Sequence, residues 1–525
     1  MENNHQIIIV GAGPAGLQLA YFLEKQGYDY LILEKADKAG AFFERYPRHR
    51  TLISINKVYT GIDDEETNMR FDWNSLTSEE FKPLFKEYTR EYFPDADKLV
   101  TYLNDYAQIH NVKVKYNTEV SMIDKDEKGQ FTINTSTGET YTTEYLVMAA
   151  GLYLPYMPQI NGMEHVIPYT ECSVDPDDYI NQRVLVLGKG NSAFETADAL
   201  ISTASKIHVL SPNPVKMAWK THFVGHLRAI NNNFLDTYQL KSQNALIDGE
   251  IEKITKQEDG SFKVTVAYAH ANGEVEDLIY DKIIACTGFR FDNSVFAEGV
   301  MPELTINERF PNQKSSWEST NVDNLYFAGA ITQMRDFKKH TSGFIHGFRY
   351  NCQCLFEILA GKINGKEWNN VKVEPTVEAI TSHVIKSVNR TSSLWQQFGF
   401  IGDALVIDHN NKEARYYSNI PVDFAKDTYF MKEEEYFLIT LEYGHEIFEK
   451  SPDPFKIERV HRNDVANADQ SAFLHPIVRQ YRGGELVSTH HIIEDFENLW
   501  SEEEVHVQPL FKYFQQQLKS AEVMS

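Results

Sequence analysis

Cysteine is scarce in this sequence, and its positions do not suit thiol chemistry. The 525 residues include four cysteines, and no two of them form a C-x-x-C motif. Cys352 and Cys354 lie two residues apart in a helix-like stretch, where such positions face different sides of a helix. The pattern argues against a disulfide framework and against a redox-active dithiol. The histidines show no ligand spacing with Cys172 or Cys286 either, so we expect no metal site.

Excess positive charge and long apolar runs are lacking as well. The chain has 51 Lys and Arg against 75 Asp and Glu, a net charge of −24. No basic stripe is present to displace phosphate counterions, so a nucleic-acid partner is not expected. The apolar segment 7–23 has no basic residues before it and holds Gly-x-Gly-Pro in its middle, which is not typical of a signal peptide or membrane span. We therefore expect a cytoplasmic protein without a membrane partner.

The sequence does contain two dinucleotide-binding fingerprints. The first, IIIVGAGPAG, covers residues 7–16, and the second, VLVLGKGNSA, covers residues 184–193. Each follows a strand-like apolar run and precedes a helix-like stretch, which is the context that such a motif requires. The pyrophosphate of a nucleotide then lies on the positive end of the helix. The residues expected to bind it are Gly11, Gly13, Pro14, Ala15 and Gly16 in the first copy, and Gly188, Gly190, Asn191, Ser192 and Ala193 in the second.

The two copies differ at the position where the second strand should end. Glu34 stands there in the first copy and Ser211 in the second. A carboxylate accepts hydrogen bonds from a ribose 2′-OH and repels a 2′-phosphate, whereas serine does not repel it. The first copy therefore favours a nucleotide with a free ribose. The second favours NADPH, with NADH also possible, since Lys206 and Lys216 lie near Ser211 in the sequence.

Each fingerprint opens a stretch of similar organisation. A strand–helix–strand start leads to an antiparallel hairpin region and to a short apolar strand, which ends at Gly151 in the first copy and at Gly288 in the second. Period-2 alternation and glycine-containing turns support the strands. The first copy is longer mainly because of an insertion near 40–100. Its helix-like end places apolar side chains at helical spacing, which we interpret as packing; they are Leu99, Tyr102, Leu103 and Tyr106.

These features together resemble the two-dinucleotide-binding-domain flavoproteins, and among them the flavin-containing monooxygenases. The strings that carry this resemblance are GAGPAG with Glu34, MAAG (148–151), ACTG (285–288) and NLYFAGA (324–330). Longer strings resemble the FAD-dependent oxidoreductase domain-containing protein 2 family over almost the whole chain: YPRHRTLISINK, SVDPDDY, LRAINNNFLDTYQLKS, GFIHGFRY and HHIIEDF. The chain ends AEVMS, without the retention tail of a luminal relative, so we do not expect a thiol-handling role in the secretory pathway to carry over.

The predicted fold class is α/β, with two Rossmann-like dinucleotide-binding domains and a C-terminal α+β domain. The stretch 341–361 predicts a long helix that returns to the first domain over the flavin, and the strand-like pieces after 366, with a Gly483-Gly484 turn and a final helix, indicate the appended domain. We place the FAD-binding domain at 1–155 and 283–365, the inserted NAD(P)H-binding domain at 156–282, and the appended domain at 366–525.

The sequence departs from the monooxygenase pattern at two places. The F-x-G-x-x-x-H motif before the second fingerprint is absent, with Ile160 for the Phe and no His at the last position. Ala330 replaces the usual aspartate that binds the flavin ribityl chain, so that chain must rely on other groups, such as the backbone of 341–345. These departures bear more on oxygenation than on FAD binding.

The segment 39–57 implies the reactive part of the site, because by resemblance it wraps the flavin ring. Arg48, His49 and Arg50 form a cationic cluster there, which can stabilise a reduced flavin, bind phosphates, or simply pair with surface carboxylates. Asn56 matches the asparagine that many flavin monooxygenases set beside the flavin, although a turn role would also explain it. His222 and Arg228 are candidates to face the nicotinamide or the substrate. The remaining cofactor-binding candidates are Lys35, Phe43, Arg50, Val120, Ala150, Gly329, Gly343 and Phe344.

Two functions from different classes fit these residues. The first is an NAD(P)H-dependent flavin monooxygenase that oxygenates a small nucleophilic nitrogen or sulfur compound through a C4a-(hydro)peroxyflavin, with O₂ and a small molecule as partners. The second is a reductase or oxidase that exchanges electrons with a thioredoxin-like protein, which would have to bring the dithiol itself. A non-catalytic nucleotide sensor fits less well, given two cofactor sites. A homo-oligomer is possible on either reading.

Overall fold

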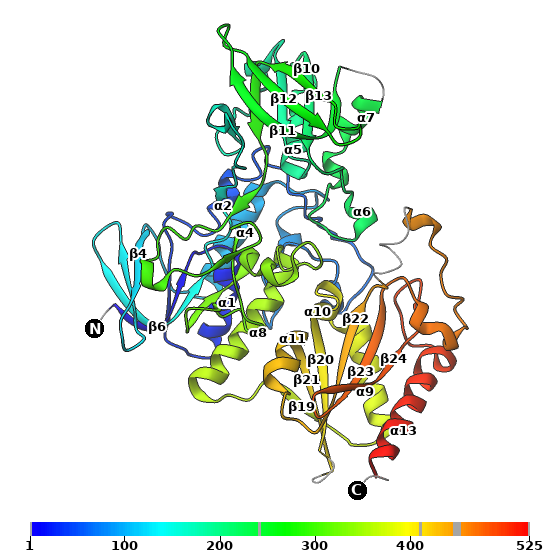
Figure 1. Ribbon diagram of the computed structural model, residues 1–525. Coiled ribbons are helices and arrows are strands. Elements are labelled where there is room, and N and C mark those ends of the chain that lie inside the picture. The colour runs from blue at the N-terminus through cyan, green and yellow to red at the C-terminus, as the bar shows by residue number, and fades with distance from the viewer. Residues whose placement is uncertain (1–2, 240–242, 409–411, 445–452, 523–525) are drawn as a thin grey trace.

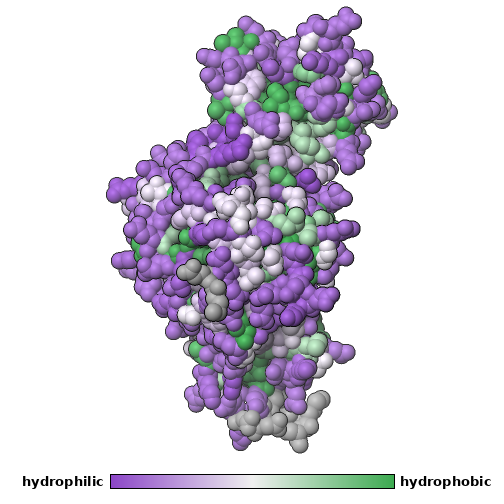
Figure 2. All heavy atoms as spheres, turned by 90° about the vertical axis from the view of Figure 1, so that its left-hand side faces the viewer, coloured by the Kyte–Doolittle hydropathy of each residue, from purple (hydrophilic) through white to green (hydrophobic). Residues whose placement is uncertain are grey.

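The computed structural model describes residues 3–239, 243–408, 412–444 and 453–522. Three large sheets organise these residues into a first, a second and a C-terminal unit (Figure 1). The second unit lies at the top of Figure 1 and the C-terminal unit at the lower right. The side of the molecule in Figure 2 is mostly hydrophilic, with scattered apolar residues, as expected for a strongly charged surface. No helix in the described part of the chain is both long and apolar enough to cross a membrane.

The first sheet has the strand order β3-β2-β1-β6-β5-β4, and β18 pairs with β6. Its strands are β1 (Asn4–Val10), β2 (Tyr30–Leu33), β3 (Val114–Lys115), β4 (Val120–Lys125), β5 (Phe131–Thr135), β6 (Thr140–Met148) and β18 (Leu325–Phe327). The strands β1, β2, β6 and β18 run parallel, with α1 (Pro14–Lys25) and α8 (Ile345–Asn364) packed together beside them. The long helix after β18 therefore returns to the first unit.

The insertion in the first unit contains short helices and one long one. These are α2 (Phe42–Arg45), α3 (Glu65–Asn68) and α4 (Ala96–Ile109). The helical spacing of Leu99, Tyr102, Leu103 and Tyr106 predicted a packing face, and all four side chains are buried in the core.

The second sheet repeats the pattern with the order β13-β12-β11-β10-β9-β14-β8. Its strands are β8 (Ile167–Pro168), β9 (Arg183–Leu187), β10 (Lys206–Ser211), β11 (Ala245–Lys256), β12 (Phe262–Tyr268), β13 (Val275–Tyr280) and β14 (Lys282–Ala285). Its helices are α5 (Asn191–Leu200), α6 (Ala218–Thr221) and α7 (Asn233–Gln239). The two chain crossings between the units pair as β7 (Leu154–Pro155) and β15 (Phe289–Arg290), and β16 (Leu304–Thr305) pairs with β17 (Phe310–Pro311).

The C-terminal unit is a six-stranded sheet with the order β19-β21-β20-β22-β23-β24. Its strands are β19 (Asn370–Val373), β20 (Ile401–Asp408), β21 (Glu413–Pro421), β22 (Glu435–Glu442), β23 (His475–Arg482) and β24 (Glu485–His491). Its helices are α9 (Val377–Arg390), α10 (Ser392–Gln396), α11 (Val422–Phe424) and α13 (Gln508–Glu522). One buried apolar cluster runs from Leu355 in α8 to Tyr417 and Tyr436 in this sheet, so the C-terminal unit shares a core with the first. The predicted fold class is confirmed.

Candidate functional site

The loop after β1 leaves room for a phosphate at one glycine only. A Cβ at Gly11, where φ is +107°, would lie 2.8 Å from the Ala149 carbonyl oxygen, and one at Gly16 would overlap the Gly11 carbonyl. A Cβ at Gly13 would meet nothing within 4 Å. The helix α1 begins there with no side-chain cap and no acidic residue in its first turn. Free amides and open space at a helix N-terminus fit a pyrophosphate.

Glu34 lies beside this loop with its carboxylate fixed. The Ala12 N–H donates to one carboxylate oxygen at 2.6 Å, and the Ala36 N–H donates to the other at 2.9 Å. The side chain is nearly buried, directly after β2. The Gly40 N–H donates to the Ala12 carbonyl at 3.0 Å, which brings the start of the 39–57 segment to the same place. The remaining acceptor capacity of Glu34 fits a ribose hydroxyl.

The loop after β9 has the same geometry. A Cβ at Gly188 would overlap the Cys286 carbonyl, whereas one at Gly190 would meet nothing within 4 Å. Helix α5 also begins without a side-chain cap or an acidic first turn. The second loop therefore fits a second dinucleotide. Asn191, its first helical residue, donates to the carbonyls of Gly225 and His226 and accepts from the Arg228 N–H at 3.0 Å, so it fixes the loop after α6.

Lys189, between the two glycines, extends to the end of the neighbouring strand. Its ammonium donates to the carbonyls of Ser211 (3.3 Å) and Asn213 (3.1 Å) and pairs with the Asp248 carboxylate. The Ser211 hydroxyl donates to the Asn213 carbonyl. The pKa of Asp248 is lowered, because the lysine outweighs burial, which acts in the other direction. The slot that Glu34 occupies in the first copy therefore lies beside a Lys189–Asp248 ion pair, in which the lysine side chain is only 4% exposed.

Some of the other predicted cofactor residues lie beside the first loop, and others lie elsewhere. A Cβ at Gly329 would contact the Ala15 side chain, and the Ala150 backbone lies against Gly11. The Phe43 N–H donates to Gly40, and Val120 opens β4 two residues after Thr118, whose N–H donates to the Glu34 carbonyl. Lys35 lies over the Tyr153 ring, Arg50 pairs with Asp97 at 2.5 Å, Gly343 lies against Gln333, and Phe344 is the N-cap of α8.

Arg48 joins the first unit to the second. Its guanidinium donates to the carbonyls of Thr170 (3.2 Å) and Cys172 (2.6 Å). Its backbone N–H donates to the Tyr169 hydroxyl, which in turn donates to Glu195 in α5. Burial raises the pKa of Glu195 to about 7, against the opposing effect of these hydrogen bonds. The charge of Arg48 is thus directed at the second unit rather than into the nucleotide loop.

The other candidates for the reacting centre are only partly brought together: Asn56 forms a β-bridge with Asp72, the residue before Trp73. Asn56 is buried and donates its amide to the Thr89 carbonyl at 2.9 Å. His49 follows Arg48, and burial together with that arginine lowers its pKa. His222 lies against the Tyr443 ring of the C-terminal unit, 4.7 Å between centroids. The guanidinium of Arg228 lies over the Trp73 ring at 4.9 Å.

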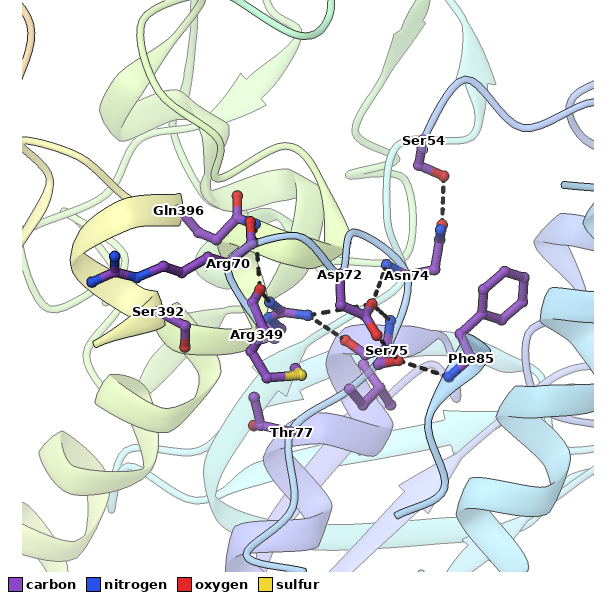
Figure 3. A network of polar contacts seen from close by, with 12 residues as sticks. Ser54, Arg70, Asp72, Asn74, Ser75, Thr77, Phe85, Arg349, Ser392 and Gln396 are labelled. Atoms are coloured by element: carbon purple, nitrogen blue, oxygen red, sulfur yellow. Dashed lines mark hydrogen bonds and ion pairs between the residues drawn. The ribbon is translucent and has the colours of Figure 1, made fainter. Parts of the chain in front are cut away.

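A buried network fixes the loop that carries Trp73. Figure 3 shows Arg349 of α8 extending to this loop, where it donates to the carbonyls of Ser75 (2.9 Å) and Met69 (2.7 Å). Asp72 closes the loop by accepting from the Ser75 N–H at 2.7 Å. From the C-terminal unit, Gln396 donates to the Arg70 carbonyl at 2.5 Å. Three parts of the chain therefore hold one loop in place.

Comparison with known proteins identifies the family of this chain. Residues 8–329 match the family described as "Pyridine nucleotide-disulphide oxidoreductase". The mouse protein named "FAD-dependent oxidoreductase domain-containing protein 2" is 34% identical over 97% of this chain and 83% of its own length. The chain belongs to these families. The resemblance inferred from sequence is confirmed, and the protein is a flavin-dependent oxidoreductase that uses a nicotinamide cofactor.

Two solved structures from different functional classes share the fold of this flavoprotein. The Staphylococcus aureus structure titled bacillithiol disulfide reductase Bdr has a TM-score of 0.51 at 20% identity, covering 69% of this chain and 100% of its own. The flavin-containing monooxygenase from Stenotrophomonas maltophilia has a TM-score of 0.52 at 17% identity, covering 68% and 99%. At these identities the likeness establishes the two-nucleotide fold and leaves the acceptor of the electrons open.

All four thiols of the flavoprotein are buried and unpaired with one another. Burial is the largest influence on each, and it raises the pKa of all four: Cys172, Cys286, Cys352 and Cys354. The thiolate is the reactive form, so burial makes these groups poor partners for disulfide exchange. The Cys352 thiol donates to the Ala15 carbonyl at 3.5 Å, behind the first nucleotide loop.

Sequence reasoning missed two groups at these sites. Lys189 stands between the fingerprint glycines, and a lysine at that position was a readable signal for a charge near the ribose. Trp73 carried no such signal. It lies in the long insertion, and its partners Arg228 and His346 are far away in the sequence.

Proposed function

We propose that this protein is an NADPH-dependent flavin monooxygenase that oxygenates a small nucleophilic nitrogen or sulfur compound. The observation that carries the proposal is the presence of two nucleotide-fitting loops in a chain whose four thiols are all buried. FAD, when bound, supplies two-electron reduction by a nicotinamide and reaction with O₂. One oxygen atom of O₂ then goes to the substrate and the other to water, with NADPH providing the two electrons. Oxygen is an acceptor that requires no protein thiol.

The residues of the chain bind the two nucleotides and position the reacting groups. The Gly13 loop and Glu34 hold the FAD nucleotide, while the Gly190 loop and Lys189 hold NADPH. Asn56 offers a buried amide, which by the family pattern lies beside the flavin and positions the reacting oxygen. Arg48 acts as a tie between the units, because its guanidinium donates to the carbonyls of Thr170 and Cys172.

A disulfide reductase is the second candidate. The matched family is named for pyridine nucleotide-disulphide oxidoreductases, and the structural likeness to Bdr supports it. In that case the electrons pass from FAD to a disulfide of a partner protein, because the thiols of this chain are buried. The partner would need to bring its disulfide directly to the flavin.

Isotope labelling separates the two functions. Purified FAD-loaded protein is supplied with NADPH, ¹⁸O₂ and a panel of thioethers and secondary amines. A monooxygenase yields a product that carries one ¹⁸O atom, in amounts close to the NADPH consumed. Asn56→Ala should divert electrons to hydrogen peroxide, whereas Asn181→Ala, at a turn of the second unit, should not. NADPH oxidation that requires a dithiol protein, with no labelled product, would contradict the proposal.

A further inference from the structure

Arg228 carries a half-buried positive charge that no carboxylate of the described chain neutralises. Only its backbone N–H is tied, to Asn191, and its guanidinium lies with one face over Trp73. Burial lowers its pKa. An unneutralised guanidinium beside an aromatic ring suits an anionic ligand.

Aromatic side chains surround this cation. The Trp73 ring centroid lies 4.5 Å from that of His346, and the Phe344 ring stacks on His346 at 5.8 Å with an angle of 13° between the ring planes. His346 is 1% exposed, and neither ring nitrogen reaches a hydrogen-bond partner, although the Trp73 main chain lies near. Burial, with Arg349 and Arg228 nearby, keeps the pKa of His346 well below its usual value. The neighbourhood is therefore aromatic, and of its two arginines Arg349 lies near the Asp72 carboxylate whereas Arg228 does not pair with an acid.

Hydrogen bonds within the protein fix both the loop that carries Trp73 and the backbone of Arg228. Arg349 fixes the loop of Trp73 from α8, and Asp72 closes that loop (Figure 3). On the other side, Asn191 holds the Arg228 N–H from the first turn of α5, directly after Gly190. A nucleotide bound at the Gly190 loop would therefore lie next to Asn191, the residue that positions Arg228.

We propose that Arg228 and Trp73 form the substrate-anion site of this enzyme. Arg228 binds a carboxylate through its planar fork, and Trp73 packs against a flat, apolar body attached to that carboxylate. This deepens the proposed function, on which it rests, by assigning the substrate to the aryl or alkyl carboxylic acids that bear a nucleophilic nitrogen or sulfur. A carboxylate matches the guanidinium fork with two parallel hydrogen bonds, and the aromatic faces exclude water around them.

The test is calorimetric titration of the FAD-loaded protein with benzoate, its neutral isostere benzamide, and inorganic phosphate. Benzoate should bind, and benzamide should bind at least tenfold more weakly. Arg228→Met should weaken benzoate binding at least tenfold, and Arg228→Lys should weaken it less, because the charge remains without the fork. Trp73→Leu should weaken benzoate binding while leaving the preference over benzamide. Arg415→Met, in β21 of the C-terminal sheet, should bind benzoate like the parent.

Several results would overturn the inference. They are an absence of benzoate binding to the parent protein, equal benzoate binding to folded Arg228→Met or Arg228→Lys, and an Arg228-dependent site that takes phosphate in preference to benzoate. The last result would assign the cation to a phosphate group instead. Because the readout is binding without turnover, a protein that binds benzoate through Arg228 but gives no labelled oxygenation product would contradict the proposed function and leave this site intact.

Discussion

At the scale of single residues, we propose that Glu34 anchors the first nucleotide. Its two carboxylate oxygens already accept from Ala12 and Ala36, so the group is aligned before any ligand arrives. Glu34→Arg should lose most of the bound FAD, because it removes the ribose acceptor and places a long cation in a nearly buried position. The flavin absorbance per protein after purification measures this. The exposed Glu164→Arg should keep its flavin; a yellow Glu34→Arg protein with full occupancy would refute the assignment.

Lys189 should set the choice between the two nicotinamide cofactors. Its ammonium lies at the carbonyls of Ser211 and Asn213, where a 2′-phosphate would attach, and Asp248 competes for it. Lys189→Met should reduce the preference for NADPH over NADH by roughly tenfold, the effect of one charge-assisted hydrogen bond. Asp248→Asn should raise that preference. The rate of flavin reduction per unit concentration of each donor measures both; no change in either variant would place the 2′-phosphate elsewhere.

At the scale of elements, Arg349 contributes two of the buried hydrogen bonds that hold the loop 69–75. Arg349→Met should destabilise the protein by about 1–3 kcal/mol, because it strands the buried carbonyl of Ser75, whereas the Met69 carbonyl keeps a longer hydrogen bond from Gln396 at 3.5 Å. Amide exchange in the loop should accelerate, and the melting temperature should fall. Arg415→Met should leave the melting temperature unchanged. An unaltered loop in Arg349→Met would show that Asp72 and Gln396 hold it without the arginine.

Sequence predicted the elements whose signals are local. The strand–glycine–helix starts and the buried face of α4 follow from short-range periodicity, and Glu34 follows from a fixed distance along one βαβ unit. The contacts of Arg48 and Arg228 do not, because each joins segments more than a hundred residues apart. The cluster of charged residues in the sequence identified Arg48 as a candidate site residue. Only the packing of the two units shows that its guanidinium donates to main-chain carbonyls. The pairing of an arginine with Trp73 is likewise a product of tertiary structure.

At the scale of the whole molecule, the junction of the first two units contains a group that titrates near neutrality. Burial raises the pKa of Glu195 from 4.5 to about 7 in the folded protein. The folded state therefore holds a proton that the unfolded state releases between about pH 4.5 and 7, and the stabilisation present below that window is lost as the pH rises through it. The melting temperature of the parent relative to Glu195→Gln should fall between pH 5 and 7.5. A constant difference would mean that Glu195 stays ionised.

At the scale of the whole molecule, the C-terminal unit is also packed against the first unit. It shares a buried core with α8, and Gln396 holds the loop beside Trp73. Its position beside the site was outside the reach of sequence reasoning, which treated it as an appendage. The fold nonetheless joins it to the first unit, because both helix α8 and the loop that carries Trp73 contact it. We therefore expect the first and C-terminal units to unfold together.

The most direct test of the central claim is how the reduced flavin is reoxidised. The FAD-loaded protein is reduced by NADPH without oxygen and then mixed, in a stopped-flow instrument, either with O₂ or with an oxidised thioredoxin-like protein under anaerobic conditions. The account predicts reoxidation by O₂, with a hydrogen peroxide yield that falls well below one per flavin when an accepted substrate is present. Rapid anaerobic reoxidation by the disulfide, with O₂ giving peroxide in full yield whatever substrate is added, would contradict it.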